Sequence, residues 1–311
     1  MNKYLPEGSL LREAKNFEYT RSYEGLEAAM RDGAILEGIA MLCDHNLNLH
    51  IELGRGILAV IPRGEAVYTD GEEIKDIAIL TRVGKPVAFK VIGFEEKPHG
   101  ARVVILSRRS AQRECRENYI STLSPGDIIP SRVTHLESFG AFVDIGCGIT
   151  SLLSIDTISV SRISHPSARL SVGDMIYTAI KGVDERGRIF VTLRELLGSW
   201  EENARLFTEG ETVRGVIRSI ESYGVFVELM PNLAGLAEYR SDVSIGQCAA
   251  VYIKSILPDK MKIKLIIIDA QDALTEPTPI EYFINPREKR HIERWLYSPL
   301  SSERVIETVF G

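Results

Sequence analysis

Hydrophobic and polar side chains alternate along the stretch SFGAFVDI near the middle of the chain, and this period of two predicts a β-strand. Ala141, Val143 and Ile145 share one face, which is small and apolar, as the interior of a barrel requires. Phe142 and Asp144 share the opposite face, so we expect a ring and a carboxylate on the solvent side. An outward ring fills no core, and a surface of such rings can stack on flat molecules.

The same pattern returns 84 positions further on, where 21 residues can be aligned without a gap. Phe139 aligns with Tyr223 and Phe142 with Phe226, and in both copies a glycine follows the first ring. Chance rarely preserves an inward set, an outward set and a glycine together, so the chain contains an internal repeat. We therefore predict two ring pairs on solvent-facing strands, each able to stack on flat ligands.

Strand-like patterns extend on both sides of the repeated stretch and predict five strands in each copy. The crossover after the ring strand spans 31 positions in the second copy and 20 in the third, so the third copy is shorter. The first copy is divergent, because it lacks the ring pair and has His50 in the place of Phe142. A structural or protein-contact role suits this first copy better than stacking does.

These patterns predict an all-β protein in which barrels follow one another and short helices join them. Ser22 and Gly33 are the expected start and stop of a helix in the N-terminal extension. The predicted segments, in chain order, are an extension with a short helix (1–32), a divergent barrel (33–110), a linker helix (111–124), the best-preserved barrel (125–197), a second linker helix (198–208), a barrel with a shortened crossover (209–269) and a tail (270–311).

Two segments outside the barrels leave alternatives open. Residues 107–123 predict a helix with clustered arginines, which either contact phosphates or lie on a solvated face with local ion pairs, and we favour the second interpretation. The tail contains a stiff, proline-containing linker at 275–279, and we expect a short helix at 286–296. The aromatic rings of the tail could dock a partner, but we expect them to fold back over the protein itself.

Composition limits the class of protein. The 311 residues carry a net charge of −6, which argues against coating nucleic acid by charge alone but allows binding through stacking. No run of about 18 apolar residues is present, and the N-terminus lacks the features of a secretory signal. We therefore expect a cytoplasmic protein with no membrane partner. The four cysteines are scattered without metal-ligand spacing, so we expect them to be reduced.

Motifs for catalysis are missing from the sequence. It contains no phosphate-binding G-x-x-x-x-G-K, no G-x-S-x-G and no H-E-x-x-H. Its carboxylates do not occur in pairs at a spacing that would indicate catalysis. His135 and His165 are isolated residues that we take to be structural or incidental. We therefore expect a protein that is not an enzyme, with no catalytic residue, no cofactor and no metal site.

The repeat resembles the S1 RNA-binding domain family. The matching features are a glycine before the first strand (Gly126 and Gly210), the aromatic strands FGAFV and YGVFV, and the turn SVGD at residues 171–174. The resemblance implies an OB-fold, which is a closed five-stranded antiparallel barrel. The whole chain is similar to short, three-repeat members of the bacterial ribosomal protein S1 family, and this similarity implies RNA as the ligand.

The RNA face that the resemblance implies can be assigned residue by residue. In the second copy Asp184 and Arg188 are the acidic and basic partners of the rings, and in the third copy Lys262 stands near the position of the arginine. The predicted RNA-binding residues are Phe139, Phe142, Asp184, Arg188, Phe190 and Arg132 in the second copy, and Tyr223, Phe226, Lys262, Lys264 and Arg218 in the third. Ser154 and Glu238 stand where the family has a histidine, which weakens both sites and ranks the third copy second.

These inferences predict binding of single-stranded RNA, mRNA above all, by stacking on tandem S1-type faces, with a role in translation. The small ribosomal subunit is a further candidate partner, and we expect a monomer. RNA is favoured over DNA by the resemblance alone. The alternative is a protein-interaction or scaffold module of an RNA-processing or ribosome-associated complex, which the acidic balance and the divergent first copy would suit.

Overall fold

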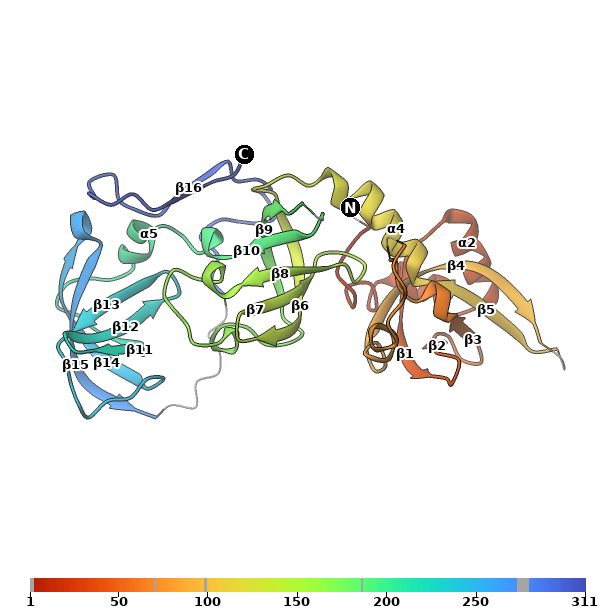
Figure 1. Cartoon of the computed structure of the whole chain (residues 1–311), viewed down its shortest axis with the longest axis horizontal. Coiled ribbons are helices and arrows are strands. Elements are labelled where there is room, and N and C mark those ends of the chain that lie inside the picture. Colours follow the sequence, from red (N-terminus) through yellow and green to blue (C-terminus); the bar gives the residue numbers. More distant parts are fainter. Residues whose placement is uncertain (1–2, 70, 98–99, 186, 273–279) are drawn as a thin grey trace. The chain divides into compact units, whose positions relative to one another are not determined.

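Three closed barrels of five strands each make up most of the protein (Figure 1). This arrangement confirms the predicted all-β class of tandem barrels joined by short helices. The linker expected at 275–279 lies outside the described residues. The computed structural model describes residues 3–69, 71–97, 100–185, 187–272 and 280–311.

The first barrel has the strand order β1-β2-β3-β5-β4. Neighbouring strands are antiparallel except for β3 and β5, which are parallel. Phe89, Leu49 and Leu106 are among the buried side chains that fill its interior. The divergent copy that the sequence predicted therefore still closes into a barrel. Its strands are β1 (Leu36–Cys43), β2 (Leu49–Glu52), β3 (Leu58–Ile61), β4 (Pro86–Glu96) and β5 (Arg102–Ser107).

The second and third barrels repeat this topology, each with one parallel pair of strands. Ala141, Val143 and Ile145 are buried in the second barrel, and Val225 and Val227 in the third, as the period of two predicted. The strands of the second barrel are β6 (Ile128–Glu137), β7 (Gly140–Asp144), β8 (Thr150–Ser154), β9 (Met175–Val183) and β10 (Ile189–Thr192). Those of the third are β11 (Thr212–Glu221), β12 (Gly224–Met230), β13 (Leu233–Ala237), β14 (Cys248–Leu257) and β15 (Lys262–Gln271).

Short helices connect and cover the barrels. The second helix begins as predicted at Ser22, whose hydroxyl accepts from the backbone N–H of Gly25 at 3.1 Å, and it ends at Gly33 in the left-handed conformation. The α-helices of the described residues are α1 (Ala14–Thr20), α2 (Tyr23–Asp32), α3 (Asp76–Leu80), α4 (Arg108–Asn118) and α5 (Trp200–Ala204). The 3₁₀ turns are η1 (Arg63–Glu65), η2 (Ile120–Thr122), η3 (Ile155–Thr157), η4 (Pro166–Ala168), η5 (Arg194–Leu196) and η6 (Pro258–Lys260).

The chain packs into two compact units. Unit 1 contains residues 1–123 and 144–150, and unit 2 contains residues 124–143 and 151–311. The short segment 144–150 therefore packs with the N-terminal part of the chain. This assignment changes the expected surroundings of two residues, Asp144 and Arg108.

A buried cluster of charged groups lies in unit 1. Asp144 was expected on the solvent side, but it is only 2% exposed and accepts from the backbone N–H of Glu7 at 2.6 Å. The Glu7 carboxylate in turn accepts from Nε of Arg108 at 2.7 Å. Arg108 was expected on a solvated helix face, and it is buried as well. Both expectations fail for one reason, which is that the N-terminal extension, distant in sequence, covers these side chains.

Glu37 belongs to the same buried region. Its Oε2 accepts from the backbone N–H groups of Gly8 at 3.0 Å and Leu10 at 2.9 Å, whereas its buried Oε1 has no partner among the described residues. Burial, together with the nearby carboxylates of Glu7 and Asp144, raises the pKa of Glu37 to about 8. The side chain is therefore held in the neutral form at neutral pH.

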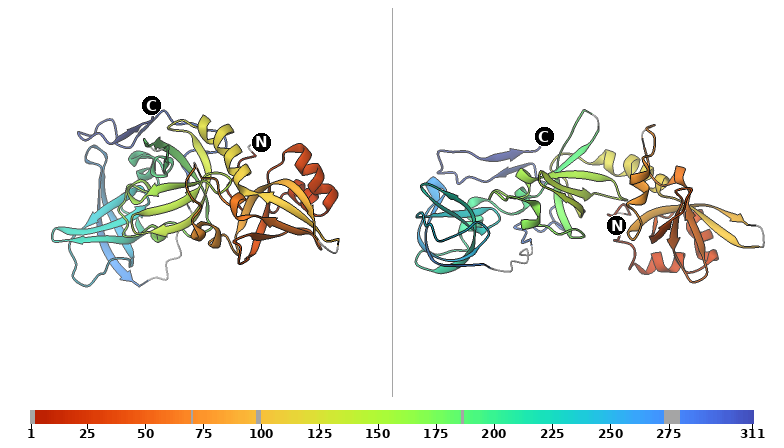
Figure 2. Two further views of the ribbon diagram at one scale, coloured as in Figure 1. Left: turned by 45° about the vertical axis from the view of Figure 1, so that its right-hand side comes forward. Right: turned by 60° about the horizontal axis from the view of Figure 1, so that its bottom comes forward.

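The C-terminal segment of unit 2 folds back over its neighbours, as expected. β16 (Arg294–Leu296) pairs with β17 (Glu307–Val309), so the short helix predicted at 286–296 is wrong. Trp295 and Tyr297, two positions apart, are both buried, which is a strand period and not a helical one. The segment lies over α5 (Figures 1 and 2), where the backbone N–H of Trp200 donates to the carbonyl of Tyr297 at 2.9 Å.

The raised pKa of Glu37 predicts a pH dependence of stability. The folded state holds a proton that the unfolded state, with the ordinary pKa of 4.5, releases. The free energy of unfolding should therefore be highest below about pH 4.5 for this group and should fall as the pH rises towards about 8. Urea titrations at pH 5 and pH 8 measure this difference. Glu37→Gln should reduce it, and the exposed control Glu52→Gln should leave it unchanged; an equal pH dependence in all three proteins would contradict the assignment.

Candidate nucleic-acid interface

Both predicted ring pairs lie open on their barrels. In the second barrel Phe139 is 52% exposed, and its ring centroid lies 6.0 Å from that of Phe142 with 87° between the planes. In the third barrel Tyr223 is 67% exposed, and its centroid lies 6.2 Å from that of Phe226 with 89° between the planes. Edge-to-face contact stabilises each pair and leaves ring faces available for stacking on bases.

A glycine is required at the first position of each ring strand because two backbones approach closely there. A Cβ at Gly140 would lie 2.5 Å from the carbonyl oxygen of Leu153, and a Cβ at Gly224 would lie 2.5 Å from that of Ala237. Only a residue without a side chain tolerates such an approach. The two glycines therefore let β8 lie against β7 and β13 against β12, and this packing fixes the strands that carry the rings.

His135 joins the ring pair of the second barrel, although the sequence marked it as incidental. Its imidazole stacks on Phe142 with 6.4 Å between centroids and 22° between planes, and its Nε2 lies 2.7 Å from Oε1 of Glu137. The aligned repeat contained the signal, because the counterpart of His135 is Ser219, which pairs in register with Phe226. The second barrel therefore presents a cluster of three rings, and the third barrel a pair.

Strand β10 extends the ring cluster of the second barrel. Phe190 pairs in register with Leu152 of β8, and both line a cavity of about 320 Å³. Asp184 lines the same cavity and accepts from Nε of Arg188 at 2.7 Å. The Arg188 side chain is 66% exposed, so the ion pair leaves it accessible to an anionic ligand. The structure thus places Asp184, Arg188 and Phe190 together at one edge of the face.

The row of paired residues across the second, third and fifth strands of the third barrel corresponds to that of the second barrel, with a cation in the place of one ring. Phe226 pairs with Leu236, and Leu236 pairs with Lys264. Lys264 therefore occupies the place that Phe190 has in the second barrel. Lys262 and Lys264 are both exposed, and neither has a hydrogen-bond or ion-pair partner among the residues that the structure describes. This face offers two rings beside two free cations.

The corresponding row of the first barrel carries neither a ring pair nor a cation. His50 pairs with Val60, and Val60 with Ile105, so His50 stands where the sequence placed it. Its Nε2 lies 3.3 Å from Oδ2 of Asp44. The backbone N–H of Asn48 donates to Asp44 at 2.9 Å and lowers the pKa of that carboxyl to about 2. This row offers a single imidazole, which is paired with Asp44, and no pair of rings for stacking.

One predicted cation, Arg218, is held in a buried ion pair. Arg218 donates from Nε to Glu228 at 2.9 Å, its side chain is only 17% exposed, and Arg169 pairs with the same carboxylate. Arg132 lies on β6, the strand between β7 and β9, and pairs in register with Met175 of β9. We therefore leave Arg218 out of the proposed contact surface, whereas an RNA contact of Arg132 stays a prediction. Sequence spacing could not reveal this, because Arg169 and Glu228 come from different barrels.

The described part of the chain contains no group of three or more histidine, cysteine or acidic side chains placed to hold a metal ion. None of its helices combines the length and the apolar character that crossing a bilayer requires.

Comparison with known proteins supports the resemblance that the sequence suggested. Residues 122–194, which contain the second barrel, match the family model described as S1 RNA binding domain. Over 294 residues the chain is 28% identical to small ribosomal subunit protein bS1 of Mycobacterium tuberculosis, and the alignment covers 89% of this chain and 58% of that protein. The chain is thus homologous to bS1 over most of its own length, but it spans less than two thirds of that relative.

Other matches extend over shorter parts. Small ribosomal subunit protein bS1 of Leuconostoc lactis is 29% identical over 187 residues, which cover 58% of this chain and 42% of the relative. Among solved structures, a multidomain protein with nucleic acid binding domains from Streptococcus pneumoniae covers 76% of this chain and 73% of its own, with 15% identity and a TM-score of 0.25.

The position of Arg218 predicts a role in stability. Arg218→Ala removes two hydrogen bonds to a buried carboxylate and should lower the free energy of unfolding of unit 2 by about 1–3 kcal/mol. Lys264→Ala removes an exposed, unpaired cation and should leave stability unchanged within about 0.5 kcal/mol. Urea titration of both variants measures the difference. Equal stability of the two variants would show that Arg218 is not held as described.

Proposed function

We propose that this chain, whose second barrel is an S1 RNA-binding domain, binds single-stranded RNA and acts in translation. One observation carries the proposal, which is the accessible ring pair that the second and third barrels both present. Bases of a single strand would stack on Phe139, Phe142 and His135, and on Tyr223 and Phe226. The accessible cations beside them, Arg188, Lys262 and Lys264, would contact phosphates.

The energetics fit a protein that needs both faces. Aromatic stacking contributes roughly 1–3 kcal/mol per base and tolerates every base, so one face alone would bind weakly. Two faces on one chain make the second contact intramolecular, at an effective concentration on the order of millimolar for short connections. The expected behaviour is sequence-tolerant binding of RNA long enough to engage both barrels.

Homology supports the cellular role. The relatives named above are small ribosomal subunit proteins, so we propose that this chain binds mRNA in association with the small ribosomal subunit, in the cytoplasm. RNA is proposed over DNA on that homology and on the S1 match. The first barrel, which has His50, Val60 and Ile105 in this row and no ring pair, would contribute a structural or protein contact and not stacking. We propose binding and not catalysis as the activity of the chain.

Removal of the rings tests the proposal. Phe139→Ala combined with Phe142→Ala should weaken binding of a single-stranded oligonucleotide about tenfold or more, because two stacking surfaces are lost. Fluorescence anisotropy with labelled oligouridylate measures the dissociation constant. The control Phe17→Ala removes an exposed ring from α1 and should leave affinity unchanged. An unchanged dissociation constant in the double variant, with the fold intact, would overturn the proposal.

The salt dependence of binding supplies an independent prediction. Few accessible cations adjoin the ring faces, so few counterions should be released on binding. The slope of log K against log salt should lie between about −2 and −3, because each contact with a single strand contributes about −0.7. Titrations between low and moderate salt measure this slope. Lys262→Gln with Lys264→Gln should bring it closer to zero by about 1.4; an unchanged slope would exclude these lysines from the interface.

A further inference from the structure

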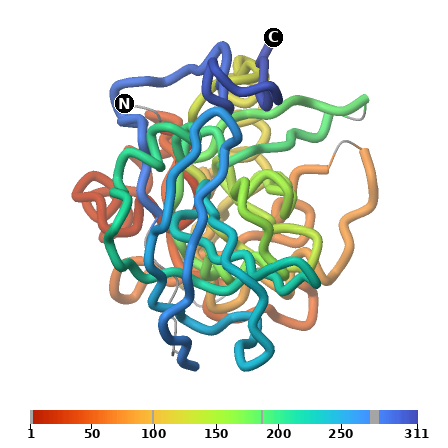
Figure 3. Tube along the Cα trace, turned by 90° about the vertical axis from the view of Figure 1, so that its left-hand side faces the viewer, coloured from red at the N-terminus to blue at the C-terminus, as the bar shows by residue number. Residues whose placement is uncertain are grey.

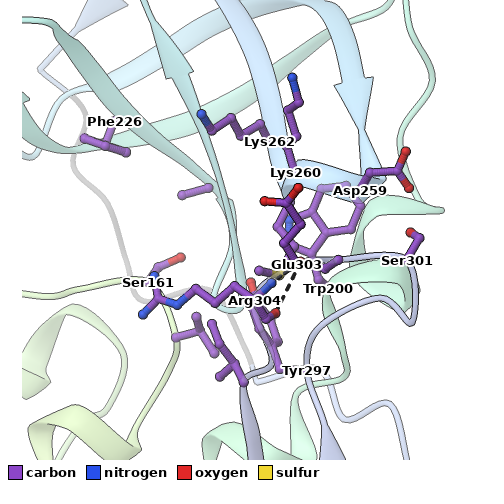
Figure 4. Close-up of a pocket in the computed structure, with 15 residues that line it drawn as sticks. Ser161, Trp200, Phe226, Asp259, Lys260, Lys262, Tyr297, Ser301, Glu303 and Arg304 are labelled. Carbon is purple, nitrogen blue, oxygen red and sulfur yellow. Dashed lines mark hydrogen bonds between the residues drawn. The ribbon is translucent and has the colours of Figure 1, made fainter.

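A second surface adjoins the ring pair of the third barrel. A cavity of about 980 Å³ begins at Phe226, continues past Ala234 and Lys262 on the neighbouring strands, and ends against the loop that joins β16 to β17 (Figure 4). All of its lining residues belong to unit 2. The cavity is therefore continuous with the face that carries the proposed stacking rings.

Two segments far apart in the sequence form the walls of this groove. One wall is the turn between β14 and β15, at η6 and Met261, and the other is the loop at residues 301–306. The two come close to each other at the top of Figure 3. Met261 has a positive φ of 47°, which bends the chain so that Lys260 and Lys262 flank the turn.

The floor of the groove is firmly held. Trp200 and Tyr297 line it, and both are buried. The hydroxyl of Tyr297 donates to the carbonyl of Asn232 at 2.7 Å, and its backbone N–H donates to the carbonyl of Ile306 at 2.9 Å. These bonds fix the loop at residues 301–306 to the third barrel. The second wall is thus attached to unit 2 by these hydrogen bonds.

The groove carries an excess of positive charge. Lys260, Lys262 and Arg304 line it together with Asp259 and Glu303. None of the three cations has a hydrogen bond or ion pair from its side chain within the described residues, and Arg304 extends across the groove towards Ser161 (Figure 4). Free guanidinium and ammonium groups beside hydroxyls are the usual contacts of a phosphodiester backbone.

We propose that the loop at residues 301–306 is the second wall of an RNA groove. A single-stranded RNA whose base stacks on Phe226 would continue into this groove, with its phosphates against Arg304. Continuity with the ring face and the three unpaired cations favour a single-stranded nucleic acid over a peptide as the occupant. This inference rests on the proposed function. It adds that the C-terminal segment, which no barrel contains, lengthens the stretch of RNA that the third barrel holds.

The test compares two arginines of the same segment. Arg304→Gln removes the cation from the groove, whereas Arg287→Gln makes the same change at an exposed position outside it. Affinity is measured with oligouridylates of about 4 and about 16 nucleotides, which bracket the length that one OB-fold binds. Arg304→Gln should weaken the long oligonucleotide several-fold and bring its salt slope closer to zero by about 0.7, while the short one is unaffected. Arg287→Gln should change neither.

The outcomes separate this inference from the proposed function. Failure of the unaltered protein to bind either oligonucleotide would overturn both. If Phe226→Ala weakens binding and Arg304→Gln does not, the RNA face stands and the second wall is refuted. If Arg287→Gln reproduces the loss, net charge and not the groove is responsible, and the inference is again refuted. Unchanged thermal unfolding of Arg304→Gln confirms that its effect does not come from misfolding.

Discussion

The close approach of two backbones at Gly140 and Gly224 is the constraint on which the candidate site depends. In both barrels a Cβ would lie 2.5 Å from a carbonyl oxygen of the next strand, so the position accepts only glycine. The strand that begins at this glycine therefore packs closely against its neighbour. Its small apolar residues face the core, and its ring faces solvent. The ring pairs are thus held by the barrels themselves, and a rigid platform loses less entropy when a base stacks on it.

One position in the fold carries different chemistry in each barrel. The row across the second, third and fifth strands is His50, Val60 and Ile105 in the first barrel, and it ends in Phe190 in the second and in Lys264 in the third. The topology of the three barrels is the same. The scaffold therefore fixes where these side chains stand, and their residue types give the same place in each barrel a different chemistry.

Local patterns allowed much of this structure to be predicted. Alternation of period two and the aligned repeat predicted the barrels, the inward valines and the two ring pairs, because these depend on neighbours along one strand. Asp144 could not be placed in the same way, because its partner Glu7 comes from the other end of unit 1. Arg218 likewise depends on Glu228 and Arg169. Long-range ion pairs and the docked C-terminal loop have no periodic signal in the sequence.

Direct mapping of the contact surface tests the central claim most sharply. Single-stranded RNA is crosslinked by ultraviolet light to the intact chain at low salt, and the modified residues are identified by peptide mass spectrometry. The account predicts adducts on the two ring turns, at Phe139 or Phe142 and at Tyr223 or Phe226, with none on the corresponding row of the first barrel, which starts at His50. Adducts confined to the first barrel, with both ring turns unmodified, would contradict it.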